Sequence, residues 1–309
     1  MRYSIIGTGG IGGYYGGRLA QHGSEVHFLL HSDYEYVKLH GLQVDSVKGS
    51  FHLDAPLVYN DARQLPLSDV VLVCLKTTNN HLLPQLLASA ADSHTLVVLI
   101  QNGIGVEEDV QSLLPQLQLA AGMAFICTAK AGPGHISHQD LGHINLADYS
   151  CRDKALLQQV VEDFCQAGIA AREVDYLQAR WQKAVWNMPY NGMTVALDTQ
   201  TDCLMKNPST RELIRAQMME IVHTTKQLGI AGVDEAFVDK MMSMTDTMKP
   251  YSPSMKLDYD YRRPMEIQYL YSRPLQIARE AGAPMPKLEM LEAELRFIEE
   301  KRIGNSGAR

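Results

Sequence analysis

The feature that most constrains the fold is a glycine loop, which follows directly on the apolar stretch Tyr3–Ile6 and has the sequence Gly7-Thr8-Gly9-Gly10-Ile11-Gly12. An amphipathic pattern over Ile11–His22 comes next. A strand, a tight glycine turn and a helix in this order are typical of the first unit of a dinucleotide-binding parallel sheet. In that unit the first glycine permits the turn, the second lets the backbone approach a pyrophosphate, and the third lets helix and strand pack closely. The residues expected to bind such a cofactor are therefore Gly7, Gly9, Gly10, Ile11 and Gly12.

The first 174 residues alternate short apolar runs with helical patterns. The predicted strands are Tyr3–Ile6, Glu25–Leu30, Val70–Leu75, Leu96–Ile100, Ala120–Ile126, His135–Ser137 and His143–Leu146, and the predicted helices are Ile11–His22, Asn80–Ala91 and Asp153–Gln166. The segment Gly41–Tyr59 is rich in β-branched and turn residues and predicts a small β excursion. Alternating strands and helices indicate a parallel sheet with helices on both faces. We therefore expect a Rossmann-like α/β domain over residues 1–174.

From about Tyr176 the pattern changes to long helices with almost no strand signal, which predicts an all-α domain over residues 175–309. Ser209 and Glu212 have the spacing of a capping box, which predicts a helix with its N-cap at Ser209. Further helices are predicted at Asp234–Met248, Ser254–Gly282 and Pro286–Arg302.

Composition agrees with a soluble two-domain chain, since 309 residues at about 150 residues per domain suggest two domains. The 28 Lys and Arg against 35 Asp and Glu give a net charge of −7, which argues against nucleic acid as a partner. No apolar run approaches the roughly 20 residues of a membrane helix, and no signal region follows Met1. Five cysteines, an odd number without a CxxC pair, favour the reducing cytoplasm.

Polar residues end three of the predicted strands at the edge where parallel sheets bind ligands. Lys76 follows one apolar run and Asn102 follows the next, so both are candidates to face a cofactor ribose or a substrate. After the second strand the residues are His31 and Ser32, where a site that prefers NAD usually has a carboxylate. A missing carboxylate leaves room for a 2′-phosphate that His31 can contact, which favours NADP(H).

A polar stripe marks the first helix of the second half. Lys183, Asn187 and Asn191 lie at i, i+4 and i+8 and fall within about 80° of one helical face. The rest of that helix carries apolar side chains such as Trp181 and Val185. A polar stripe on an apolar helix is either solvated or lines a cleft, and the pattern alone does not decide between these.

Taken together, these motifs resemble the 2-dehydropantoate 2-reductase (ketopantoate reductase) family along nearly the whole chain. The residues that carry the resemblance are the glycine loop with its continuation Gly13-Tyr14-Tyr15-Gly16, Lys76, Gln101-Asn102-Gly103, Pro133–His138, the stripe Lys183, Asn187 and Asn191, and the pair Ser254 and Glu266 with Asp258, Arg263 and Pro264. The resemblance implies a Rossmann-like domain followed by an all-α domain, with the active site in the cleft between them. Many members of the family have Arg where this chain has His31.

The resemblance also implies a role for each matching residue. Lys183 would be the general acid that meets the C2 carbonyl oxygen of the substrate, and Glu266 would bind the substrate hydroxyl. Ser254 and Asn191 would bind the carboxylate end. Asn187 and Asn102 would make supporting contacts, and Lys76 would lie near the cofactor. The implied reaction is the NADPH-dependent reduction of 2-dehydropantoate to pantoate, a step of pantothenate biosynthesis.

The implied chemistry is sound, because hydride arrival at a ketone leaves negative charge on oxygen that an ammonium stabilises and protonates. Burial of Lys183 would favour the neutral amine, whereas a nearby Glu266 carboxylate would favour the charged form. Two alternatives stay open: a reductase of another 2-keto or 3-hydroxy acid, and a non-catalytic NADP-binding redox sensor. The expected small-molecule partner is a 2-keto acid, and a homodimer is our working expectation for the assembly.

A cluster of His135, His138, Asp140 and His143 invites a metal interpretation. Residues three apart on a strand face opposite sides, so His135 and His138 are expected to diverge. The spacing also lacks the helical pattern of a zinc-binding HExxH motif. We therefore expect no metal site here.

Overall fold

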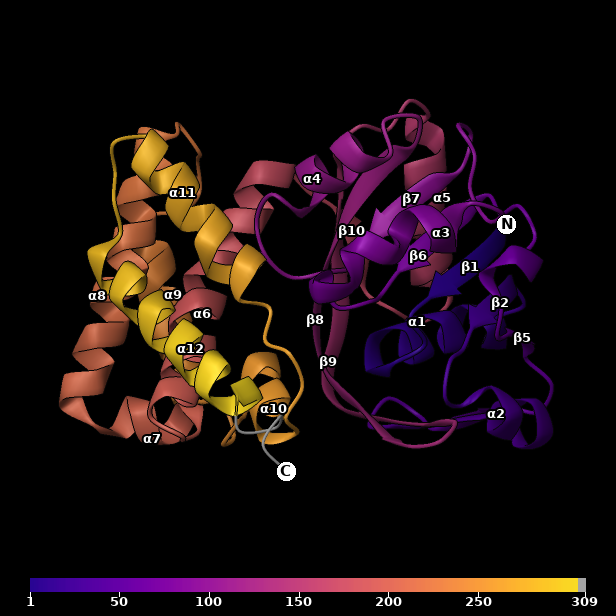
Figure 1. The fold of residues 1–309 in the computed structure, drawn as a ribbon, viewed down its shortest axis with the longest axis horizontal. Helices are drawn as coiled ribbons and strands as arrows, with labels where there is room; N and C mark the ends of the chain where they lie inside the picture. Colours follow the sequence, from indigo (N-terminus) through magenta and orange to yellow (C-terminus); the bar gives the residue numbers. More distant parts are fainter. Residues whose placement is uncertain (305–309) are drawn as a thin grey trace. The chain divides into compact units, whose positions relative to one another are not determined.

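The computed structural model describes residues 1–304, whose contacts divide the chain into two compact units (Figure 1). The first unit comprises Met1–Gln101 and Val106–Tyr176. The second comprises the short segment Asn102–Gly105 and the chain from Leu177 onward. Strands occur in the first unit, and the second is built from helices, so the predicted class of a Rossmann-like α/β domain with an all-α domain is confirmed.

Within the described residues, the strands of the first unit form one ten-stranded sheet in the order β4-β3-β9-β8-β7-β6-β1-β2-β5, with β10 beside β9. The strands are β1 (Arg2–Ile6), β2 (Glu25–Leu29), β3 (Leu42–Ser46), β4 (Phe51–Leu53), β5 (Leu57–Tyr59), β6 (Val70–Val73), β7 (Leu96–Leu99), β8 (Gln118–Gly132), β9 (His135–Asp148) and β10 (Ala171–Glu173). The run from β8 through β7, β6, β1 and β2 to β5 is parallel, as the alternation of strands and helices predicts.

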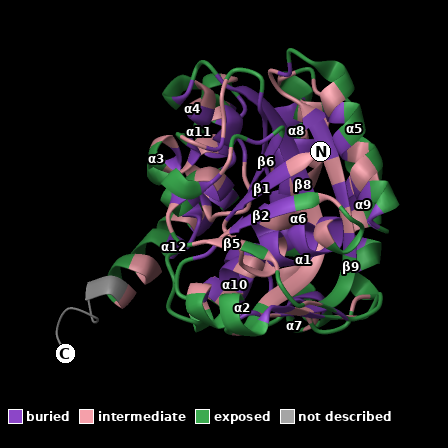
Figure 2. Cartoon of the chain, turned by 90° about the vertical axis from the view of Figure 1, so that its right-hand side faces the viewer, coloured by how far each residue is buried: buried purple, intermediate pink, exposed green. Residues whose placement is uncertain are grey.

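The central strands are continuous apolar runs because both faces of the sheet are covered. Every residue of β6 and β7 is buried, as Figure 2 shows for β6, which is the pattern of a parallel sheet between helical layers. Helices α1 (Gly10–Gln21) and α5 (Lys154–Gln166) share one core cluster with β1 and β6. The remaining helical segments of this unit are α2 (Tyr34–His40), η1 (Ala62–Gln64), η2 (Thr77–Leu82), α3 (Leu83–Leu87) and α4 (Val106–Leu113).

Two predictions about this unit are wrong. The three short strands expected between residues 120 and 146 are instead the long antiparallel hairpin of β8 and β9, which is interrupted by register shifts that disturb the alternation of side chains. The helix expected at Asn80–Ala91 is a 3-10 turn, η2, followed by the short helix α3, in which Pro84 occupies the first turn.

The second unit has its own apolar core, to which Trp181, Tyr190, Ile214 and Leu288 contribute. Its elements are α6 (Tyr176–Ala196), α7 (Thr201–Lys206), α8 (Pro208–Gln227), α9 (Glu235–Asp246), α10 (Ser254–Asp260), the π-helical turn η3 (Gln268–Ser272), α11 (Arg273–Glu280) and α12 (Pro286–Gly304). Helix α6 carries the polar stripe and continues through Pro189.

Two helix boundaries in this unit also differ from expectation. Helix α8 begins at Pro208 with Asn207 as its N-cap, whose side chain accepts the N–H groups of Ser209 and Thr210. Proline is favoured at the first helical position because it has no N–H group that needs a partner. The helix therefore begins after Asn207 and not at the predicted capping box of Ser209 and Glu212. The single helix expected over Ser254–Gly282 is broken after α10, where Arg262 has a φ of 55°. Pro264 follows, and the chain becomes helical again after Glu266.

Candidate active site

The glycine loop has the three geometries that its spacing predicts. Gly7 has a φ of +96°, and a Cβ atom there would lie 2.8 Å from the Leu75 nitrogen. A Cβ atom on Gly12 would lie 2.3 Å from the Gly7 oxygen, which shows how closely helix α1 packs on the turn. At Gly9 a Cβ atom would meet nothing within 4 Å. The loop therefore turns tightly, leaves open space beside Gly9 and begins a helix that no side chain caps, which fits a diphosphate.

The residues that follow β6 and β7 are fixed by a buried amide. Gln101 donates hydrogen bonds from Nε2 to the Leu75 oxygen at 2.9 Å and to the Asn80 Oδ1 atom at 2.7 Å. These bonds join the residue that follows β7 to the segment that follows β6, which contains Lys76. Lys76 itself is half-buried and is the N-cap residue of η2.

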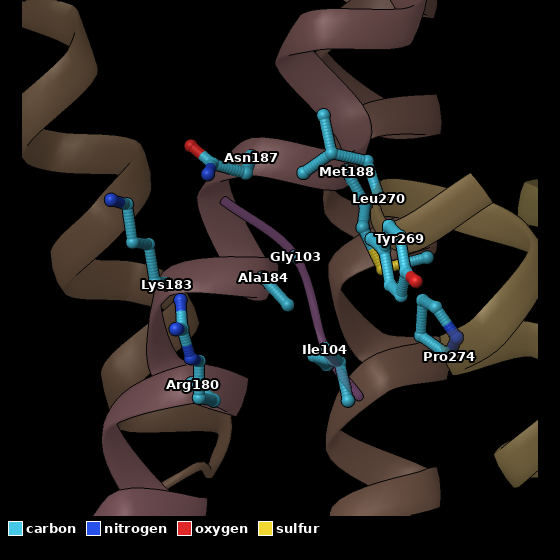
Figure 3. A pocket seen from close by; sticks show the side chains of 10 residues that line it. All are labelled: Gly103, Ile104, Arg180, Lys183, Ala184, Asn187, Met188, Tyr269, Leu270 and Pro274. Carbon is cyan, nitrogen blue, oxygen red and sulfur yellow. The ribbon is translucent and has the colours of Figure 1, made fainter. Parts of the chain in front are cut away.

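A small pocket of the second unit contains the expected general acid (Figure 3). Its lining comes from α6 (Arg180, Lys183, Ala184, Asn187 and Met188), from the 102–105 segment (Gly103 and Ile104), and from η3 and α11 (Tyr269, Leu270 and Pro274). In the close view, Lys183 and Asn187 project from the same side of α6. The structure thus brings two of the stripe residues to one pocket wall.

The electrostatics of Lys183 follow from its surroundings. The pKa of the Lys183 ammonium is lowered from 10.5 to about 7; burial is the largest cause, the Arg180 guanidinium adds to the decrease, and the Glu266 carboxylate opposes it. Burial and the neighbouring cation together outweigh the carboxylate. An amine with a pKa near neutrality can both donate and recover a proton at physiological pH, which is the property that a general acid needs.

The remaining members of the predicted site lie in the same unit. Asn191 is buried, and its Nδ2 atom donates to the Asn187 carbonyl oxygen at 2.9 Å. Its Oδ1 atom accepts the N–H of Met255 at 3.0 Å, which holds the first turn of α10, where Ser254 lies. Glu266 is only 3% exposed and precedes η3. Turns of π-helix are found at functional sites more often than elsewhere.

Asn102 belongs, by its contacts, to the helical unit. The Ile104 N–H donates to the Tyr269 oxygen at 3.0 Å. Gly103 has a φ of +107°, and a Cβ atom there would lie 2.5 Å from the Tyr269 Cβ atom. The segment after β7 is therefore pressed against η3, and no sequence pattern indicates this contact. Asn102 therefore belongs to the same unit as Lys183.

Sequence reasoning missed Arg180, which is 2% exposed and lines the same pocket as Lys183. It lies three residues before Lys183 on α6, so the helical spacing that groups the stripe also places Arg180 on that face. Two cations in one pocket are suited to an anionic ligand such as a carboxylate.

The expected divergence of the histidines is observed, since His135 contacts Asp45 and His138 contacts Ser46.

A parallel sheet with this glycine loop and a helical unit with a lysine-lined pocket define a two-domain oxidoreductase with a Rossmann-like N-terminal domain. Comparison with known proteins agrees. The family model described as ketopantoate reductase PanE/ApbA matches residues 3–150, and the model of its C-terminal domain matches residues 175–299. The chain belongs to the ketopantoate reductase PanE/ApbA family.

Individual relatives support this assignment. A curated 2-dehydropantoate 2-reductase from Nostoc sp. is 43% identical over 96% of this chain and 95% of its own length. The crystal structure of 2-dehydropantoate 2-reductase from Geobacter metallireducens has a TM-score of 0.91 at 35% identity, covering 96% of this chain and 99% of that one. The enzyme from Methylococcus capsulatus has a TM-score of 0.89 at 31% identity, with 98% of each chain covered.

Among residues 1–304, no helix is both long and apolar enough to cross a bilayer.

Proposed function

We propose that this chain reduces 2-dehydropantoate to pantoate with NADPH, a step of pantothenate biosynthesis. The observation that carries the proposal is the Lys183 amine, whose pKa is lowered to about 7 in a pocket that it shares with Arg180 and Asn187. The 43% identity to the curated reductase from Nostoc supports the choice of substrate.

The reaction adds a hydride to the C2 ketone and a proton to its oxygen. A bound reduced nicotinamide supplies the hydride. The ammonium of Lys183 stabilises the charge that develops on the ketone oxygen and then gives up a proton to it. The neutral amine recovers that proton from water, which its pKa of about 7 allows near neutral pH.

The neighbouring side chains bind and orient the keto acid. In the proposal Glu266 accepts a hydrogen bond from the substrate hydroxyl, and Ser254 and Asn187 donate to its polar groups. Asn191 acts through the α10 turn, because its amide holds the backbone that follows Ser254. The Arg180 guanidinium adds positive charge opposite the substrate carboxylate. Asn102 makes a supporting contact.

The glycine loop binds the cofactor diphosphate through Gly7, Gly9, Gly10, Ile11 and Gly12, and Lys76 lies near the nicotinamide ribose in this proposal. His31 is exposed at the end of β2, where the adenosine ribose binds in this fold. The five cysteines are all free thiols, which supports a reducing compartment such as the cytoplasm.

A steady-state assay with 2-dehydropantoate, run with NADPH and NADH in parallel, tests the proposal. We expect turnover with a higher kcat/KM for NADPH. Failure with both cofactors would overturn the substrate, and a panel of other 2-keto acids would then find the true one. Tight NADP(H) binding without turnover on any keto acid would instead indicate a redox sensor. Light scattering tests the homodimer, which is the state described for a ketopantoate reductase of this fold from Staphylococcus aureus.

A further inference from the structure

The acidic residue nearest the end of β2 is occupied by contacts within the protein. Asp33 is 6% exposed and is the N-cap residue of α2. Its Oδ1 atom accepts hydrogen bonds from the Lys130 Nζ atom at 2.5 Å and from the Ser32 hydroxyl at 3.1 Å. Its Oδ2 atom accepts the Gly134 N–H at 3.0 Å. A carboxylate at the end of the second strand recognises the ribose of NAD in other dinucleotide sites; Asp33 lies just beyond that position, and both of its oxygens already have donors.

These contacts keep Asp33 ionised. Burial by itself raises the pKa of the Asp33 carboxyl, but the hydrogen bonds from Lys130 and from the Gly134 amide outweigh it, so that the pKa lies below its ordinary value. The negative charge of Asp33 is therefore permanent near neutral pH and is matched by the Lys130 ammonium.

The hairpin of β8 and β9 places Lys130 beside the glycine loop. A Cβ atom on Gly10 would lie 3.1 Å from the Thr128 oxygen and 3.2 Å from the Ala129 Cα atom, so this part of β8 packs on the loop. On the other side of the loop, the Thr8 hydroxyl donates to the Leu29 oxygen at 3.0 Å, at the end of β2. The loop thus contacts both the hairpin and the end of β2, and Lys130 lies where the hairpin meets Asp33, in the segment that follows β2.

Lys130 retains capacity for a ligand. An ammonium has three N–H donors, and Asp33 accepts from one of them. The Lys130 side chain is 37% exposed, whereas that of Asp33 is 8% exposed. The Lys130 ammonium is therefore accessible, whereas the Asp33 carboxylate is covered. A ligand that approaches the end of β2 would meet the ammonium of Lys130, which Asp33 holds in a fixed orientation.

We propose that Lys130, oriented by Asp33, binds the 2′-phosphate of the adenosine ribose and that this pair gives the chain its selectivity for NADP over NAD. The inference rests on the proposed function in that the glycine loop must bind a nicotinamide dinucleotide. It assigns the main phosphate contact to a residue 97 positions away from Asp33 in sequence, with His31 as a weaker neighbour.

The test is calorimetric titration of the purified full-length chain with 2′,5′-ADP and with 5′-AMP, which differ by the 2′-phosphate. The wild type should bind 2′,5′-ADP at least about tenfold more tightly, the lower end expected for a charged hydrogen bond. Lys130→Met should raise the Kd for 2′,5′-ADP about 10- to 100-fold, while the Kd for 5′-AMP should stay within about twofold of the wild-type value. Lys130→Arg should restore the difference, because it keeps the charge.

Lys154→Met is the matched control, since Lys154 is also an exposed lysine paired with an aspartate, Asp148, in the first unit. It should change neither affinity. If Lys130→Met does not fold, lysine acylation of the wild type read by mass spectrometry takes its place: 2′,5′-ADP should protect Lys130, and 5′-AMP should not.

Equal affinities of the wild type for the two ligands, an unchanged preference in Lys130→Met, or equal loss of both ligands overturns the inference. Because no keto acid is present, absent turnover of 2-dehydropantoate leaves it intact. Failure of the wild type to bind either ligand would instead remove the proposed dinucleotide site itself, and the inference with it.

Discussion

The side chain of Asn191 accepts the backbone N–H of Met255 at 3.0 Å, and this bond joins the central helix α6 to the first turn of α10. The same amide donates to the Asn187 carbonyl oxygen at 2.9 Å. A residue that belongs to the polar stripe of α6 therefore also fixes the backbone next to Ser254. The stripe is a structural connection between two parts of the candidate site.

Asn191→Leu should destabilise the fold and weaken substrate binding. It removes the acceptor for a buried N–H, which costs about 1–3 kcal/mol of unfolding free energy. The α10 turn should then shift, so that KM for the keto acid rises more than kcat falls. Asn191→Asp keeps the acceptor but sets a buried carboxylate oxygen against the Asn187 carbonyl oxygen, so it should be destabilised as well. Urea unfolding and steady-state kinetics measure both effects, and a Leu variant as stable as the wild type would show that the bond contributes nothing.

Lys183→Ala should lower kcat by about 10²- to 10⁴-fold, which is the usual effect of losing a general acid. This corresponds to about 3–5 kcal/mol of activation free energy. Lys226→Ala is the control, because Lys226 is an exposed lysine on α8 of the same unit. Turnover of Lys183→Ala within threefold of the wild type would exclude Lys183 from proton transfer.

Local patterns were sufficient to predict the parts of the molecule that depend on near neighbours in sequence. The glycine loop follows its strand and begins its helix as expected, since these three elements are contiguous. The stripe on α6 was visible because helical periodicity fixes which side chains share a face. The break after α10 was missed because a pattern of apolar residues does not register the combined effect of Arg262 and Pro264.

Contacts between distant residues were not predictable in this way. The pairing of Asp33 with Lys130 depends on where a long hairpin bends, and the docking of Gly103 on Tyr269 depends on the path of a loop. Neither leaves a periodic signal, because each contact involves a single residue of each partner segment. The pKa of Lys183 likewise depends on two neighbouring charges and on burial, whose balance only the coordinates provide.

Gly103→Ala should be more harmful than the same change at another glycine with positive φ. At Gly103 the alanine Cβ would meet the Tyr269 side chain and backbone, at 2.5 Å and 2.6 Å. At Gly229, which has a φ of +69°, the Cβ would meet nothing within 4 Å. Gly229→Ala should therefore cost about 1–2 kcal/mol of backbone strain, and Gly103→Ala should cost about 1–3 kcal/mol more from overpacking.

Gly103→Ala should also lower kcat, because the shift of the segment displaces Asn102. Thermal or urea unfolding gives the stability difference between the two variants, and the keto-acid assay gives the kinetic one. Equal stability losses at the two glycines would show that the contact with Tyr269 is unimportant.

The pH dependence of the reaction should report the charges around Lys183. Reduction needs the protonated amine, so kcat should fall as pH rises through about 7, and the reverse oxidation, which needs the neutral amine, should rise over the same range. Arg180→Gln removes a group that lowers the pKa of Lys183. In this variant the fall of kcat with rising pH, the descending limb of the pH–rate profile, should therefore move to higher pH. Glu266→Gln removes a group that raises the pKa, so its limb should move to lower pH.

Arg180→Lys keeps the positive charge and should leave the limb in place, which separates the effect of charge from that of packing. Pre-steady-state rates at several pH values would show these shifts even if the substitutions also change KM. Movement of the limb in the same direction for Arg180→Gln and Glu266→Gln would mean that the titrating group is not Lys183, because the two substitutions alter its surroundings with opposite sign.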